Sequence, residues 1–98
     1  MSSTQEQQGK TSTTGLSIIL PTFNEAESIA AVIQSLLALD DHFDLEILVV
    51  DDDSSDGTAE TVRSLARQDQ RIRIIRRLGR SGLASAIREG LIDAIHHR

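Results

Sequence analysis

Cysteine, tryptophan and tyrosine are all missing from the 98-residue sequence, which contains one proline and two phenylalanines. The lack of cysteine excludes a disulfide framework, a thiol nucleophile and thiolate ligands for a metal. No apolar run approaches the roughly 20 residues that a membrane helix needs, and the first residues contain no apolar segment of the kind found in signal peptides. These absences favour a cytoplasmic protein. They leave open a location at the cytoplasmic face of a membrane for a longer form.

Charge is distributed unevenly along the chain, which carries a formal net charge of −5. Residues 1–70 hold 13 acidic and 3 basic side chains, whereas residues 71–98 hold 7 basic and 2 acidic ones. The negative net charge, and arginines that are not interleaved with aromatic residues, disfavour nucleic-acid binding. An acidic region and an arginine-rich region in one small domain suit a ligand that carries a base, a ribose and phosphates. Ordinary solvated surface charge is the alternative.

The N-terminal segment 1–15 is polar, being rich in serine, threonine, glutamine and glycine. Such a segment has almost no apolar surface to bury, which predicts a disordered tail. Residues 16–98 then form one domain. It is long enough for a core, but so short that its stability should be modest.

Short apolar runs alternate with helical patterns along the rest of the chain. Leu16–Leu20 is expected to be a strand that ends at Pro21, because proline cannot donate to a β-ladder. Leu45–Val50 ends in a continuous β-rich run, as in a strand of a parallel sheet that is covered on both faces. A third strand is expected over Ile72–Ile75.

Three helices are predicted to follow these strands. Asn24, with Glu27 three residues later, fits a capping box at the start of the first helix. The second helix should begin near Asp56 or Gly57. In the third helix Gly90 would allow a close approach to the sheet. That helix should lie on the sheet through an apolar stripe formed by Leu83, Ala86, Ile87, Leu91, Ala94 and Ile95.

The order of strand and helix, repeated three times, predicts a Rossmann-like three-layer α/β/α fold with a parallel sheet. Right-handed crossovers would place the carboxyl ends of all three strands at one edge of the sheet. Residues 21–25, 51–56 and 76–82 should therefore converge there. This edge is also where ligands bind in open α/β sheets.

The predicted edge combines carboxylates, an aromatic ring and arginines. Asp51, Asp52 and Asp53 would repel phosphate, but a carboxylate accepts the N–H groups of uracil or guanine, and a second one a ribose hydroxyl. Phe23 offers an aromatic face to a base, and the arginine-rich loop would face the phosphates. Each residue also has a structural interpretation: the aspartates could simply end a strand, and Phe23 could lie in the core.

Three motifs, in this order, carry a family resemblance. They are Ser17–Ile29 with Pro-Thr-Phe-Asn-Glu, Ile47–Thr58 with Val-Val-Asp-Asp-Asp-Ser, and Arg77–Ala86 with Leu-Gly-Arg-Ser-Gly-Leu. Together they resemble the opening of family 2 glycosyltransferases of the GT-A fold, and among these the dolichol- or polyprenol-phosphate mannosyltransferases. The resemblance covers residues 16 to about 94. At the position of Phe23, tyrosine is commoner in the family. Phenylalanine retains the aromatic ring.

The resemblance implies a nucleotide sugar, GDP-mannose or a UDP-sugar, as ligand and a polyprenyl phosphate as one acceptor. It implies that Val50 contacts the base through its backbone and that Asp52 binds the base or the ribose. Arg77 begins the segment that flanks the diphosphate and sugar. No catalytic residue is assigned. The candidate nucleotide-sugar-binding residues are Pro21, Phe23, Glu25, Val50, Asp52, Asp53 and Arg77.

Members of the family hold Mg²⁺ or Mn²⁺ through an Asp-X-Asp motif that follows a fourth strand. Asp51 and Asp53 are formally such a pair, but they follow the second strand, in the position of the base-binding motif, so no metal ligand is assigned. Residues 16–98 are therefore expected to be a partial GT-A domain, a truncated nucleotide-binding half with little transferase activity alone. An unpaired strand edge beside Leu16–Leu20 would favour self-association.

Two other interpretations stay open. Val-Val-Asp-Asp-Asp also resembles the first strand and acidic pair of a response-regulator receiver, although the strand that follows ends in arginines and no lysine comes after it. A regulatory domain that binds a nucleotide without catalysis is the second. A dinucleotide site is disfavoured, because no Gly-X-Gly-X-X-Gly follows the first strand.

Overall fold

The computed structural model describes residues 14–79 and 82–97. Three parallel strands form one sheet in the order β2-β3-β4, and the elements alternate along the chain as expected. Their bounds are β2 Gly15–Thr22, α1 Ile29–Leu37, the short 3₁₀ helix η1 Ala38–Asp41, β3 Asp44–Asp51, α2 Thr58–Gln68, β4 Ile72–Arg76 and α3 Leu83–His97. The disordered tail was predicted over residues 1–15, of which 1–13 lie outside the described residues. Its C-terminal bound is wrong, because Gly15 already begins β2.

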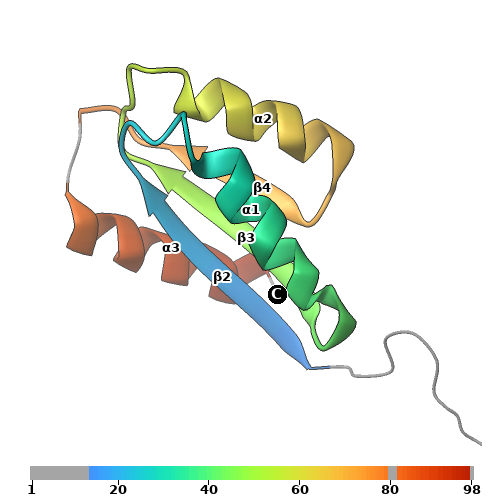
Figure 1. The fold of residues 1–98 in the computed structure, drawn as a ribbon. Coiled ribbons are helices and arrows are strands. Elements are labelled where there is room, and N and C mark those ends of the chain that lie inside the picture. Colours follow the sequence, from blue (N-terminus) through green and yellow to red (C-terminus); the bar gives the residue numbers. More distant parts are fainter. Residues whose placement is uncertain (1–13, 80–81, 98) are drawn as a thin grey trace, which may run out of the picture.

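The sheet is covered by helices on both faces, as Figure 1 shows: α1 and α2 lie on one face and α3 on the other. All three strands point the same way, so their carboxyl ends meet at one edge (Figure 1). The predicted three-layer α/β/α fold with a parallel sheet is confirmed.

The central strand β3 supplies both halves of the core. Ile47 and Val49 pack with α1 and α2, whereas Leu48 and Val50 pack on the α3 side. All four side chains are completely buried. Alternate residues of a strand point to opposite faces, so a strand covered on both faces must be apolar throughout.

Helix α1 begins later than expected. Its N-cap residue is Ser28, which makes no side-chain cap hydrogen bond, so the predicted capping box of Asn24 and Glu27 is wrong. Asn24 instead has a left-handed backbone, with φ of 54°. The backbone amide of Asn24 donates to Ser54 Oγ, and its side-chain Oδ1 accepts from the backbone amide of Ser55. Asn24 is thus bound to the loop after β3, and the helix starts only after an extra turn.

Helix α3 presents small residues to the sheet. Ala86 and Ala94 are buried, while Leu83 and Ile95 are 65% and 73% exposed. Gly90 lies between the two alanines on this face, where an added Cβ would be only 2.5 Å from Ile19 Cγ2. The expected close approach at Gly90 is confirmed, but the expectation that the large apolar residues of the stripe lie on the sheet is wrong. Close packing of the helix backbone on the sheet requires the small residues there.

An ion-pair network ties α3 to the sheet away from the edge where the strands end. Arg73 of β4 contacts Glu46 Oε2 of β3 at 2.7 Å and Asp93 Oδ1 of α3 at 2.6 Å. Ser17 of β2 donates to the other oxygen of Glu46 at 2.8 Å. Each strand of the described sheet therefore contributes one side chain to this network, which fixes where α3 crosses it.

At the start of β4, Asp69 is bound by Arg71 through both Nε and Nη2, at 2.9 and 2.6 Å. These hydrogen bonds from the guanidinium lower the pKa of Asp69 from its ordinary value of 3.8. As the pH falls below that value, the unfolded chain takes up a proton that folded Asp69 does not, so the free energy of unfolding should decrease. Urea unfolding followed from about pH 6 to about pH 3 should show this loss, and a shallower one in Asp69→Asn. Equal slopes in the two proteins would contradict this role of Asp69.

Within residues 14–79 and 82–97, no helix is both long enough and apolar enough to cross a membrane.

Candidate functional site

A cavity of about 190 Å³ opens where β2 and β3 end, beside the start of α3. Phe23 and Glu25 line it from the loop after β2, and Asp52 lines it from the loop after β3. Phe23 is 37% exposed, so it is not a core residue. The lining residues are Pro21, Thr22, Phe23, Glu25, Asp52, Gly82, Leu83 and Ala86.

Asp52 is nearly buried, and its carboxylate is held by protein donors. Arg77 Nη2 lies 3.1 Å from Oδ1, and the amide of Gly82 donates to Oδ2 at 2.9 Å. Asp52 also lines the cavity. Its carboxylate is therefore held in one position at the cavity wall.

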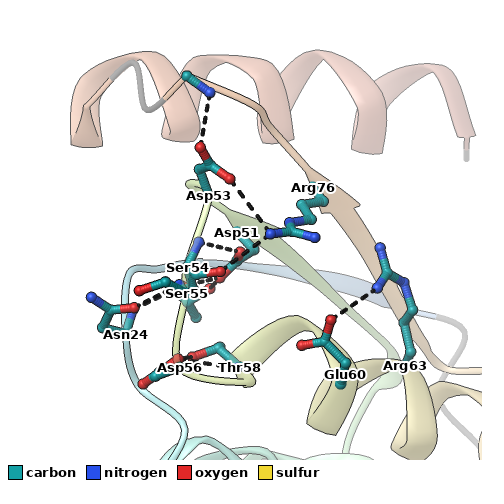
Figure 2. Close-up of polar contacts among 12 residues, drawn as sticks. Asn24, Asp51, Asp53, Ser54, Ser55, Asp56, Thr58, Glu60, Arg63 and Arg76 are labelled. Atoms are coloured by element: carbon teal, nitrogen blue, oxygen red, sulfur yellow. Dashed lines mark hydrogen bonds and ion pairs between the residues drawn. The ribbon is translucent and has the colours of Figure 1, made fainter.

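Asp51 has a structural role in the two loops that shape the cavity. Its side chain accepts from the hydroxyls of Thr22 and Ser54, at 2.7 and 2.6 Å, and from the amide of Ser54 at 3.0 Å. Ser54 in turn accepts from the backbone amide of Asn24 (Figure 2). The residues on either side of Phe23 are therefore both held. Asp51 is completely buried. It positions the aromatic wall of the cavity and does not line it.

The same two loops are joined at a further point. Asp56 Oδ2 accepts from the amide of Ala26, and its Oδ1 accepts from the hydroxyl and amide of Thr58. The hydrogen bond from the Thr58 hydroxyl lowers the pKa of Asp56. Thr58 also accepts from the amide of Glu25 through the same hydroxyl oxygen. The backbone of Glu25 is therefore fixed where this residue lines the cavity.

Asp53 points away from the cavity, toward β4 and the loop that follows it. Its carboxylate lies 3.5 Å from Arg76 Nη2 and accepts from the amide of Gly79 at 3.2 Å (Figure 2). Arg76 also donates to the backbone oxygen of Ser54. Arg76 is therefore bound to protein groups, and a contact of the arginine-rich loop with phosphates stays a prediction. Arg80 lies outside the described residues.

The structure separates the candidate residues into two groups. It brings Pro21, Phe23, Glu25 and Asp52 together around the cavity. Val50 lies inside the sheet, paired with Pro21 and Ile75, while Asp53 and Arg77 bind protein groups. A ligand-binding role for each candidate stays a prediction.

Some lining residues were not predicted from the sequence. Thr22 and Gly82 were placed at the converging edge without a role, and Leu83 and Ala86 were assigned to the sheet-facing stripe of α3. Ala86 does lie on the sheet, where it also lines the cavity. The one available signal was the position of Leu83 and Gly82 directly after the arginine-rich loop.

Comparison with known proteins identifies the family. The family model of glycosyl transferase family 2 matches residues 17–94, most of the chain. The chain belongs to glycosyl transferase family 2. The receiver interpretation is thereby set aside, and the three motifs quoted above all lie within or overlap the matched span.

Several members of glycosyl transferase family 2 resemble this chain. The dolichol-phosphate mannosyltransferase of Mycosarcoma maydis is 36% identical over 89 residues, which are 85% of this chain and 30% of that protein. The dolichol-phosphate mannosyltransferase of Pyrococcus furiosus is 35% identical over 79 residues, 81% of this chain and 22% of that one. The expected resemblance to this group is confirmed, and the chain spans less than a third of the length of either relative.

A solved structure agrees with the fold of this family member. The mannosyltransferase of Pyrobaculum calidifontis, in complex with GDP-Man and Mn²⁺, superimposes with a TM-score of 0.73 at 31% sequence identity. The match covers 87% of this chain and 26% of the other. The α/β arrangement found here is therefore part of a GT-A glycosyltransferase fold.

The described residues of this chain form no site that fits a divalent metal such as the Mn²⁺ of that neighbour. In the parts of the chain that the structure describes, no three histidine, aspartate or glutamate side chains gather as a metal site. Asp51, Asp52 and Asp53 each accept hydrogen bonds from protein donors, and the first two are buried. The formal Asp-X-Asp of Asp51 and Asp53 is therefore divided between two structural roles, with the carboxylates directed to different partners.

Proposed function

We propose that this chain binds the nucleotide of a sugar donor, GDP-mannose or a UDP-sugar, for transfer of the sugar to an acceptor such as a polyprenyl phosphate. The observation that carries the proposal is the cavity at the carboxyl ends of β2 and β3, where Phe23, Glu25 and Asp52 meet. Family membership supports a glycosyltransferase. The neighbour solved with GDP-Man and the dolichol-phosphate mannosyltransferases support this choice of donor and acceptor class.

The size of the cavity suggests which part of the donor it would take. Its volume of about 190 Å³ is below the roughly 300–1,000 Å³ of pockets that enclose a drug-sized ligand. It suits a base, with the phosphates and sugar lying outside. Phe23 would stack on the base, and Glu25 and Asp52 would accept its N–H groups or a ribose hydroxyl.

The contribution of this chain to transfer would be binding and orientation. Fixed backbones on both sides of Phe23, and the held carboxylate of Asp52, give the base one orientation without rearrangement of the loops. Preorganisation of this kind reduces the entropy lost on binding. The sugar would then be presented in a constant direction to whatever groups carry out the transfer.

Titration calorimetry with GDP, GDP-mannose and UDP-glucose tests the proposal. Phe23→Ala should weaken binding by about tenfold, because stacking of one base on an aromatic ring contributes about 1–3 kcal/mol. Glu25→Gln should also weaken it by about tenfold, because the amide cannot accept from two N–H groups of the base. Affinity should be the same with and without Mn²⁺, because no metal site is formed by the described residues.

Glu27→Gln is the matched control for Glu25→Gln. Glu27 lies two residues further along the same loop and does not line the cavity. Its replacement should leave nucleotide affinity unchanged. The assignment is wrong if no nucleotide binds the wild-type chain, or if Glu27→Gln weakens binding as much as Glu25→Gln.

A further inference from the structure

Arg77 lies behind the cavity, where its side chain is only 6% exposed. Its guanidinium reaches four different groups of the protein. Nη2 donates to Asp52 Oδ1 and to the backbone oxygen of Gly82, both at 3.1 Å. Nη1 donates to Ser85 Oγ at 2.8 Å and to Glu89 Oε1 at 3.4 Å. Arg77 therefore joins the end of β3 to the first two turns of α3.

These contacts leave Arg77 no free terminal N–H group for a ligand. A guanidinium has four terminal N–H groups and one at Nε. The contacts on Nη1 and Nη2 account for all four terminal ones. Nε is buried and has no hydrogen-bond partner among the described residues. Arg77 is thus unable to bind a diphosphate without giving up protein contacts.

The contacts of Arg77 also close a ring around one wall of the cavity. Gly82 donates its amide to Asp52 Oδ2 while its backbone oxygen accepts from Arg77. Arg77 completes the ring by binding Asp52 Oδ1. Both Asp52 and Gly82 line the cavity, and Arg77 does not. One buried side chain therefore fixes two groups that face the ligand.

We propose that Arg77 is a positioning residue, which orients the Asp52 carboxylate and the Gly82 peptide for ligand binding. The ligand in question is the nucleotide of the proposed function, on which this part of the inference rests. Arginine is suited to the task because its planar fork binds Asp52 and the start of α3 at the same time. The side chain of lysine ends in a single nitrogen, which cannot reach both Asp52 and the start of α3.

A ligand-free measurement tests the positioning itself. Hydrogen exchange of the Gly82 amide, followed by NMR, should be about tenfold faster in Arg77→Gln than in wild type, because the acceptor Asp52 is no longer held. Arg76→Gln is the matched control, because Arg76 contacts Asp53 and Ser54 and not the ring. It should leave the Gly82 amide unchanged.

Arg77→Lys keeps the test decisive if Arg77→Gln fails to fold. It preserves the positive charge beside Asp52 but lacks the second terminal nitrogen, which binds Ser85 and Glu89 at the start of α3. The folded Arg77→Lys protein should therefore still show faster exchange at Gly82. Unchanged exchange at Gly82 in either folded variant would overturn the proposal.

A double-mutant cycle on GDP affinity tests whether Arg77 acts through Asp52. Arg77→Gln and Asp52→Asn should each weaken binding by about tenfold, and the double variant should be no weaker than Asp52→Asn alone. If the affinity loss of the double variant equalled the product of the two single losses, Arg77 would contact the ligand directly. That result would overturn the inference. If wild type binds no nucleotide but Gly82 exchange still depends on Arg77, the proposed function fails while the positioning role stands.

Discussion

Replacing Gly90 by valine is expected to lower the free energy of unfolding by about 3 kcal/mol. A Cβ at this position would lie 2.5 Å from Ile19 Cγ2 and 3.1 Å from Val50 Cγ2, so α3 would have to move away from the sheet. The Ile19 methyl is attached to a branched Cβ inside a strand and cannot swing aside easily. Urea unfolding followed by circular dichroism measures the loss.

Gly90→Ala separates packing from helix propensity. Alanine in place of a helical glycine should stabilise by about 1 kcal/mol through propensity alone. Overpacking of a core commonly costs about 1–3 kcal/mol, so the net result here should be destabilising. In the background of Ile19→Ala, which removes the methyl in question, the same change should become favourable. A Gly90→Ala protein more stable than wild type would contradict the close packing of α3.

Asp51→Asn is expected to destabilise the protein by about 2–3 kcal/mol although it changes no volume. Asp51 accepts from two hydroxyls and one amide, all in a buried setting. An asparagine has only one acceptor oxygen, and its NH₂ group would face either the amide of Ser54 or the two hydroxyls. At least one buried donor would then lose its partner. Thermal unfolding and urea unfolding both measure the effect.

Asp53→Asn is the matched control, because it makes the same chemical change two residues away. The side chain of Asp53 is 38% exposed and its contact with Arg76 is 3.5 Å long. Asparagine also tolerates the left-handed backbone at this position, where φ is 63°. The change should therefore alter stability by less than about 0.5 kcal/mol. Equal losses in Asp51→Asn and Asp53→Asn would show that burial does not distinguish the two carboxylates.

The fold was predictable from the sequence where local pattern and burial coincide. The apolar run of β3 required cover on both faces, and the structure provides it through α1 and α2 on one side and α3 on the other. The pattern failed at α3, because spacing alone does not tell which of two adjacent apolar faces is buried. The buried face is the one that lets the helix approach the sheet most closely. In α3 this is the face that carries Ala86, Gly90 and Ala94. Asn24 was misassigned for a similar reason, since its partners lie about 30 residues further along the chain.

The site was only partly predictable. Parallel strands bring their carboxyl ends together, so Phe23, Glu25 and Asp52 could be expected to meet. The direction of each side chain within the acidic run could not be read from the sequence. Asp51 is turned inward to Ser54, Asp53 outward to Arg76, and only Asp52 reaches the cavity. Arg77 was predicted as a nucleotide-sugar-binding residue from its motif, and its burial beside Asp52 could not be read from the sequence.

Mapping the nucleotide by NMR is the most direct test of the proposed function. On titration of GDP-mannose into the labelled chain, the amides of Phe23, Asp52 and Gly82 are expected to shift together and to saturate at one affinity. The amides of Gln68 and Arg71, which line a hollow near the opposite end of the sheet, should not shift. Shifts confined to that hollow, or no saturable shifts at all, would contradict nucleotide binding at the carboxyl ends of β2 and β3.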